Sequence, residues 1–160
     1  MRPRRQGLAL LCGSSTSPLY GAAVVTPIVL ANIDVDDLTR ATEFYCSALG
    51  LRVGRRFEAS AVELLGASTP IYLLKRATRT TASSASAARR DYTRHWTPVH
   101  LDFVVPDISA ALARARSAGA SLEGEVSTYK WGHIAVMADP FGHGFCLIEF
   151  LGRGYDEIAS

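Results

Sequence analysis

The 160-residue chain has few cysteines, and they lie far apart. Cys12, Cys46 and Cys146 form neither the even, closely spaced set of a disulfide framework nor a Cys-x-x-Cys metal site. Unpaired cysteines of this kind are typical of a reducing compartment, so we predict a cytoplasmic location. The chain also lacks any apolar run near the roughly 20 residues that a membrane-spanning helix needs, and we expect no membrane partner.

Glycine motifs that bind phosphate are absent as well. Gly142 and Gly144 fit a turn, and no Rossmann or P-loop spacing occurs. A general excess of positive charge is missing: the formal net charge is +2, and the basic residues gather near the N-terminus and within residues 75–94. The rest of the chain is acidic, which argues against a nucleic-acid partner. We interpret the basic stretch as a solvated loop.

The composition is that of one globular domain. Apolar residues make up 48% and charged residues 20% of the chain, which is ordinary for a soluble fold of this size. We predict a flexible N-terminal extension over residues 1–23, a domain over 24–151 and a tail over 152–160. The extension resembles a signal peptide only loosely, because its apolar stretch is short and Leu11 is too bulky for a lipoprotein cleavage site.

What the sequence does contain is a repeat about 70 residues apart. Residues 28–50 have an alternating strand, an acidic turn, an apolar helical face and a closing glycine, and residues 98–119 repeat this order. The two copies are unequal: where the second carries His100, the first carries Leu30. A repeat usually builds a fold, whereas its mismatched positions indicate function.

Each half continues from its helix into three short strands. The patterns predict the following elements: a strand over 26–35, a helix over 38–49 and strands over 51–57, 61–65 and 70–74, then a strand over 98–105, a helix to about 117 and strands near 121–126, 131–137 and 143–151. Residues 77–94 are polar and of low complexity, so we predict a mobile connector between a first module (26–76) and a second (95–151). The predicted fold class is therefore α+β, with two pseudo-symmetric βαβββ modules that form a curved sheet around a cavity.

The first strand of each half has one apolar face and one more polar face, because side chains alternate along a strand. The apolar faces suit contact with the helices and hold Ile33 and Val35, and Leu101, Phe103 and Val105. The opposite faces hold Leu30, Asn32 and Asp34, and His100, Asp102 and Val104. Since these faces coincide by pseudo-symmetry, we predict a shared concave cavity; a solvated outer face is the alternative.

Four segments together indicate a family. They are Val35-Asp-Asp-Leu38, Phe44-Tyr45 with Leu49-Gly50, the echo from His100 to Asp107, and Asp139-Pro-Phe-Gly-His-Gly-Phe-Cys-Leu-Ile-Glu149. Through them, residues 26–151 resemble the vicinal oxygen chelate superfamily, which comprises glyoxalases, bleomycin resistance proteins and dioxygenases. The resemblance implies a glyoxalase/bleomycin resistance/dihydroxybiphenyl dioxygenase-like fold and a homodimer.

The resemblance also implies where a divalent metal would bind. Metal-dependent members take ligands from four positions, which correspond here to Leu30, a site near Tyr72, His100 and Cys146. Leucine cannot ligate a metal and tyrosine is an uncommon ligand, so too few donors remain for the usual site. We therefore expect no cofactor. If a metal does bind, His100 and Cys146 are the predicted ligands, with Asp34 or Asp102 as supplements.

The cavity side chains are the candidates for binding and catalysis. The predicted ligand-binding residues are Asn32, Asp34, Tyr72, His100, Tyr129, Trp131 and Cys146. His100 beside Asp102 could act as a catalytic general acid or base, since imidazole titrates near neutral pH. Alternatively, His100 only hydrogen-bonds Asp102 or a neighbouring strand. Cys146 is either a thiolate nucleophile or a small core residue.

A second cluster contains Tyr129, Trp131 and His133, with His143 across the turn at residues 139–142. Its aromatic rings either stack a planar ligand at the cavity mouth or pack against the neighbouring hairpin. His95, before the second half, is interpreted as an ordered end of the connector.

These observations predict a glyoxalase/bleomycin-resistance-like protein that binds a small organic molecule in a cavity without the usual divalent metal. The alternative is a lyase, isomerase or dioxygenase-type enzyme that uses His100 as a base or as part of an atypical metal site. A third possibility is an interaction protein that uses the basic connector. The ligand itself is not encoded in any motif.

Overall fold

The computed structural model describes residues 28–160. The predicted N-terminal extension over 1–23, with Cys12, and the first two residues of the predicted strand over 26–35 lie outside this range. Within the described residues, no helix is both long and apolar enough to cross a membrane.

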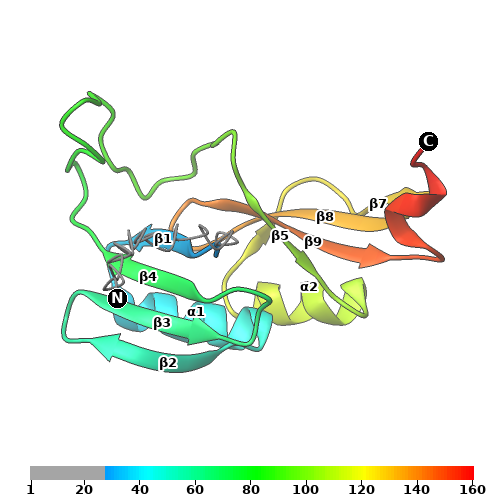
Figure 1. The fold of residues 1–160 in the computed structure, drawn as a ribbon, viewed down its shortest axis with the longest axis horizontal. Coiled ribbons are helices and arrows are strands. Elements are labelled where there is room, and N and C mark those ends of the chain that lie inside the picture. The colour runs from blue at the N-terminus through cyan, green and yellow to red at the C-terminus, as the bar shows by residue number, and fades with distance from the viewer. Residues whose placement is uncertain (1–27) are drawn as a thin grey trace, which may run out of the picture.

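The first module is a four-stranded sheet with one helix. Its elements are β1 (Ala31–Val35), α1 (Leu38–Leu49), β2 (Arg52–Phe57), β3 (Ala61–Leu65) and β4 (Ile71–Lys75). The strand order is β1-β4-β3-β2, with β1 parallel to β4 and the other pairs antiparallel. The predicted strand–helix–three-strand order is therefore confirmed (Figure 1).

The second module repeats this plan with one more strand. Its elements are β5 (Leu101–Val104), α2 (Ile108–Ser117), β6 (Ser121–Leu122), β7 (Ser127–Tyr129), β8 (Gly132–Ala138) and β9 (Gly144–Phe150), followed by the 3-10 helix η1 (Gly154–Glu157). The order is β5-β9-β8-β6, and β7 also pairs with β8. The single strand predicted near 121–126 is wrong: Gly124 has a φ of +83°, and this left-handed residue separates β6 from β7.

The acidic turns of the repeat start both helices. The carboxylate of Asp37 accepts hydrogen bonds from the backbone N–H groups of Thr39 and Arg40, and Asp107 accepts one from Ala110. These bonds satisfy N–H groups that have no partner within the helix. Gly50 ends α1 in the left-handed conformation, as the sequence predicted.

Both helices lie on the same side of the sheets and pack against each other (Figure 1). Their apolar faces and the facing strand residues form one core across the two modules. Val35 and Leu73 of the first module and Leu147 of the second are fully buried there. Among residues 28–160 no strand pairing joins the two sheets, so they do not close into a barrel. The paired-module α+β fold is confirmed, with the sheets left separate.

Two hydrogen bonds and a cation–π contact join the modules beside this core. The guanidinium of Arg40 on α1 donates to the carbonyl oxygen of Pro140 at 2.8 Å and lies over the ring of Phe141, 4.8 Å from its centroid. Tyr45, also on α1, donates a hydrogen bond to Asp139. The turn between β8 and β9 is therefore held against the helix of the first module.

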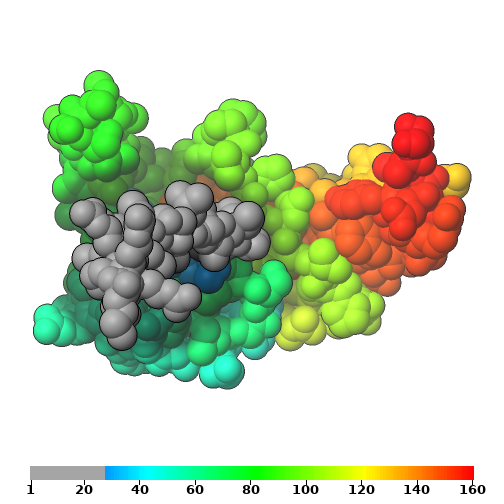
Figure 2. Space-filling view, in the orientation of Figure 1, coloured from blue at the N-terminus to red at the C-terminus, as the bar shows by residue number. Residues whose placement is uncertain are grey.

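The connector over 77–94 is irregular and makes defined contacts with both modules. It contains one isolated bridge, between Thr81 and Arg89. Arg90 forms a 2.6 Å ion pair with Asp34 of β1, and Arg94 forms an ion pair with Glu123. The expectation of a wholly solvated basic loop is thus wrong for these two arginines, although part of the connector stands out from the body (Figure 2).

Candidate functional site

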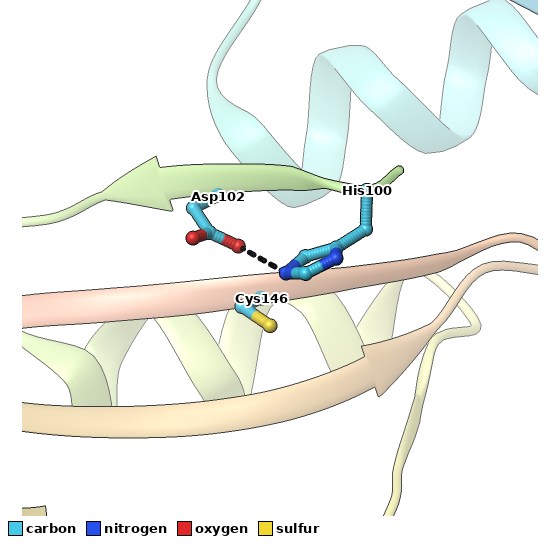
Figure 3. A group of neighbouring side chains, drawn as sticks. All are labelled: His100, Asp102 and Cys146. Carbon is cyan, nitrogen blue, oxygen red and sulfur yellow. Dashed lines mark ion pairs between the residues drawn. The ribbon is translucent and has the colours of Figure 1, made fainter. Parts of the chain in front are cut away.

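Three potential metal ligands converge on the open face of the second sheet. His100 and Asp102 are two residues apart, so they share a face of the chain at β5, and Cys146 is the register partner of Asp102 on the parallel strand β9. Nε2 of His100 lies 3.1 Å from Oδ1 of Asp102. One donor atom from each of the three residues lies within 4.8 Å of the others (Figure 3).

The cluster combines accessible and buried groups. The side chains of His100 and Asp102 are 49% and 40% exposed, whereas Cys146 is buried. Burial is the main factor that raises the pKa of the Cys146 thiol to about 11, and the charge of Asp102 and a hydrogen bond to it act in the same direction. At neutral pH the metal-free cysteine is therefore a thiol, which weakens its predicted role as a nucleophile.

The donor set fits a divalent ion of the zinc type. Imidazole nitrogen, carboxylate oxygen and thiolate sulfur are all zinc ligands, and three protein ligands with an open fourth position are typical of catalytic sites. The four metal-ligand positions of the family include only two metal donors here, His100 and Cys146. Asp102 is not at one of these positions, so the sequence alone predicted too few ligands. The structure brings Asp102 to His100 and Cys146, so the expectation of no cofactor is not confirmed.

A cavity lies between β1 and β5, where the modules meet. It has a volume of about 640 Å³ and includes both apolar and polar side chains. Of the predicted binding residues, Asn32, Asp34 and His100 line it. Apolar residues from the helix-facing sides of the strands, such as Phe103 and Phe145, line it as well. The cavity therefore lies between the edge strands β1 and β5. It is lined by side chains from both faces of these strands, whereas the sequence predicted only the polar faces.

Tyr72 lies in a separate polar cluster on the first sheet. Its hydroxyl donates to Glu63 at 2.8 Å and accepts from Arg55 at 2.8 Å, and Arg55 also pairs with Glu63 at 2.6 Å. Hydrogen bonds from Arg55 and Tyr72 lower the pKa of Glu63 to about 2. Tyr72 is thus a partner of this ion pair and is not among the cavity residues.

Tyr129 and Trp131 form an aromatic cluster near the C-terminus. Their rings are stacked, with centroids 5.3 Å apart and an interplanar angle of 4°. Trp131 also contacts Tyr155 of η1 at 5.0 Å, and Tyr155 contacts Phe150 at 4.8 Å. Neither predicted residue lines the cavity between β1 and β5, and their contacts match the packing alternative.

Sequence reasoning missed a pair of histidines in the cavity wall. His95 and His143 both line the cavity, and Nε2 of His95 lies 3.2 Å from Nδ1 of His143. From the sequence, we grouped His143 with Tyr129 and Trp131 and interpreted His95 as an ordered end of the connector. The sequence did indicate that His143 has a fixed position, because it directly follows the turn at residues 139–142.

Comparisons with known proteins agree with the observed fold. The glyoxalase-like domain family matches residues 31–148. No curated protein matches the sequence. The fosfomycin resistance protein FosX from Listeria monocytogenes has a similar structure, with 15% identity, 84% of this chain and 97% of that chain covered, and a TM-score of 0.63.

Two further solved structures show the same fold. A member of the glyoxalase/bleomycin resistance protein/dioxygenase superfamily from Sphaerobacter thermophilus is 21% identical, with 79% and 99% of the two chains covered and a TM-score of 0.59. Lactoylglutathione lyase from Agrobacterium tumefaciens is 15% identical, with 79% and 96% covered and a TM-score of 0.54. The motifs, the paired modules and the match over residues 31–148 lead to one conclusion: this chain belongs to the glyoxalase-like domain family.

Proposed function

We propose that the protein binds a small organic molecule in the cavity between β1 and β5. The cavity carries this proposal: its volume of about 640 Å³ lies within the roughly 300–1,000 Å³ of small-molecule sites. Its walls combine apolar side chains with a few polar ones, which is the usual composition of such sites.

The side chains indicate the ligand class. Leu30, Val99 and Phe103 offer an apolar surface, whereas Asn32 and His100 offer an amide and an imidazole as polar anchors. The carboxylate of Asp34 is held by Arg90, so it contributes less free negative charge than the sequence suggested. These features favour a mainly apolar molecule with at least one hydrogen-bonding group.

Two charge substitutions test this site. Leu30 lines the cavity, whereas Val104 is a similarly exposed apolar residue of β5 that does not. Thermal-shift screening of aromatic and aliphatic compounds, with fosfomycin and lactoylglutathione included, should give saturable binders that calorimetry confirms. Leu30→Arg should remove that binding and Val104→Arg should keep it. Equal binding by both variants, or no binder in the panel, would contradict the proposal.

The cluster of His100, Asp102 and Cys146 supports a second candidate, a metal-dependent lyase or isomerase. A bound divalent ion would polarise a substrate oxygen and favour the thiolate of Cys146. In the alternative without a metal, a proton on Nε2 of His100 would face Oδ1 of Asp102 at 3.1 Å, and Nδ1 would then be the nitrogen that can take a proton from a ligand. His100 also lines the cavity, so a molecule bound there can contact its imidazole ring.

Metal that is lost when the cluster of His100, Asp102 and Cys146 is changed separates the two candidates. Elemental analysis of protein purified without chelators should find about one zinc, nickel, manganese or iron ion per chain for the enzyme candidate, and iron would favour dioxygenase-type chemistry. Cys146→Ser and His100→Ala should lower this content together. An absence of metal with intact cavity binding would leave the simple binding protein. Loss of cavity binding in His100→Ala would identify His100 as an anchor.

Homodimer formation and a cytoplasmic location are also proposals. Ile28, Val29 and Val99 are 84%, 71% and 80% exposed near the cavity, and a second subunit could cover them. The two cysteines among residues 28–160, Cys46 and Cys146, are free, which suits a reducing compartment. Light scattering coupled to size exclusion should give twice the monomer mass.

A further inference from the structure

The hydrogen bonds of His95 and His143 fix where their protons must be. Nε2 of His143 lies 2.7 Å from the carbonyl oxygen of Asp34, and Nδ1 of His95 lies 2.9 Å from the carbonyl oxygen of Thr93. A carbonyl oxygen only accepts hydrogen bonds, so each of these two ring nitrogens must carry a hydrogen and donate it. The tautomers of both imidazoles follow from this.

The remaining two nitrogens face each other. In neutral imidazoles with these tautomers, Nε2 of His95 and Nδ1 of His143 carry lone pairs, and they are 3.2 Å apart. Two lone pairs at this distance repel each other unless a cation lies between them. The geometry therefore calls for either a shared proton or a metal ion.

We propose that His95 and His143 together bind a divalent transition-metal ion of the zinc type. A zinc ion about 2.0–2.1 Å from each nitrogen, with a tetrahedral angle between them, places the nitrogens about 3.3 Å apart. The observed separation of 3.2 Å matches this without rearrangement. Donation of the second ring N–H to a carbonyl oxygen is the usual way in which a metal-binding histidine is oriented. The site goes beyond the proposed function and uses neither Asp102 nor Cys146.

The backbone around the pair holds the two rings in place. The N–H of His95 donates to the carbonyl oxygen of Gly142 at 3.1 Å, and the N–H of His143 donates to Oδ1 of Asp139 at 2.8 Å. Gly142 lies so close to the connector that a Cβ atom there would come within 2.0 Å of the carbonyl oxygen of Thr93. The end of the connector and the turn at residues 139–142 are therefore in close backbone contact next to the two histidines.

The surrounding charges are compatible with a cation. The charged groups around the pair are Asp34 with its partner Arg90, Asp139 with its partner Tyr45, Asp91, and Arg94 with its partner Glu123. The ring of Tyr92 stands edge-on to His143 at 6.2 Å. Both arginines pair with carboxylates, whereas the carboxylate of Asp139 accepts hydrogen bonds only from uncharged groups and lies next to His143. Arg94 is the one of these arginines whose charge also interacts with Asp139. The field of Asp139 favours a cation at the pair.

Two protein ligands leave coordination positions open. Both histidines line the cavity, so water or an oxygen of a molecule bound there could complete the coordination. The ion would also join three segments: the end of the connector, the turn before β9 and, through Asp34, the end of β1. Metal binding is therefore expected to stabilise the fold as well as the site.

Zinc titration of matched variants tests the proposal. His100→Gln with Cys146→Ser first removes the other cluster, and this double variant serves as the background. After chelator treatment and dialysis, calorimetry at pH 7.5 should show one zinc ion bound per chain. His95→Gln or His143→Gln in this background should weaken binding at least about tenfold. His133→Gln is the control, since that ring hydrogen-bonds Thr128 and does not line the cavity. Equal binding in all variants, or none in the background, would overturn the proposal.

Two spectroscopic measurements remain informative if a variant folds poorly. Cobalt bound to the background variant should give visible bands without a thiolate charge-transfer band, which also excludes Cys12 as a ligand. Long-range ¹H–¹⁵N spectra of the imidazoles should show zinc-dependent shifts at Nε2 of His95 and Nδ1 of His143, with the outer nitrogens protonated throughout. One proton shared between the inner nitrogens, unchanged by zinc, would show the pair to be a proton site and would refute metal binding.

Discussion

The phenol of Tyr45 donates a 2.5 Å hydrogen bond to Oδ2 of Asp139, and this bond links helix α1 of the first module to the β8–β9 turn of the second. Both residues are buried, at 3% and 6% exposed. Oδ1 of the same carboxylate accepts the N–H groups of Phe141 and His143, so Asp139 has partners on both oxygens. Burial and the neighbouring Asp139 raise the pKa of Tyr45 well above its ordinary value. Two motifs that are 94 residues apart therefore meet in one bond.

Tyr45→Phe should destabilise the protein by about 1–3 kcal/mol, because it leaves a buried carboxylate oxygen without its donor. Urea denaturation followed by far-UV circular dichroism measures this change. Tyr92→Phe is the control: its hydroxyl donates to the carbonyl oxygen of Arg76 at a more exposed position, and the cost should be smaller. A Tyr45→Phe protein as stable as wild type would show that the link contributes nothing.

Gly142→Ala should destabilise the protein more than Gly124→Ala. Both glycines have a positive φ, of +85° and +83°, so alanine is strained at either position, by about 1–3 kcal/mol. Only at Gly142 would the new Cβ collide with the carbonyl oxygen of Thr93; at Gly124 it meets nothing within 4 Å. The difference in unfolding free energy isolates the fit between connector and turn. Equal losses would mean that the connector moves away freely.

Acid stability should depend on Glu63. Its pKa is lowered from 4.5 to about 2 by hydrogen bonds from Arg55 and Tyr72, so the unfolded chain binds its proton at a higher pH than the folded protein does. The stabilisation is therefore complete above pH about 4.5 and is lost as the pH falls toward 2. In Glu63→Gln, the unfolding free energy should change less with pH over this window. An unchanged slope would show that the pair does not persist in solution.

Cys146 should react slowly with iodoacetamide at pH 7.5, because its pKa of about 11 leaves little thiolate and its side chain is buried. Asp102→Asn should increase the rate, since the carboxylate charge adds to the effect of burial on this pKa. Asp102→Asn should lower the pKa of Cys146 only part of the way to its ordinary value, because burial is the larger cause of the increase. Peptide mass spectrometry distinguishes this residue from Cys12 and Cys46. Fast alkylation of the wild-type protein would indicate a thiolate.

Much of the fold was predictable because it depends on local patterns. The apolar periodicity of α1, its cap at Asp37 and its end at Gly50 are properties of a short segment, and the structure confirms each of them. The repeat correctly predicted two related modules. The extra strand in the second module was not predicted, because one glycine with a positive φ interrupts a pattern that otherwise continues.

The site was only partly predictable. Asn32, Asp34 and His100 line the cavity, and Cys146 lies beside His100 without lining it. Tyr72 and the pair of Tyr129 and Trp131 have partners elsewhere. The alternation of side chains along a strand predicts which face of the sheet a residue occupies. It does not predict which other segment of the chain packs against that face. Whether the predicted residues bind a ligand stays a prediction.

The helices and strands, their caps and the repeat with its mismatch of Leu30 and His100 follow from the amino-acid order, because each copy is a local pattern of residues. Three contacts between distant segments depend instead on how the chain packs. Asp102 meets Cys146 through the register of a parallel strand pair, Arg90 reaches Asp34 from an irregular connector, and His95 meets His143 where that connector crosses a turn. Strand register and loop path result from packing the whole chain, so no local pattern encodes them.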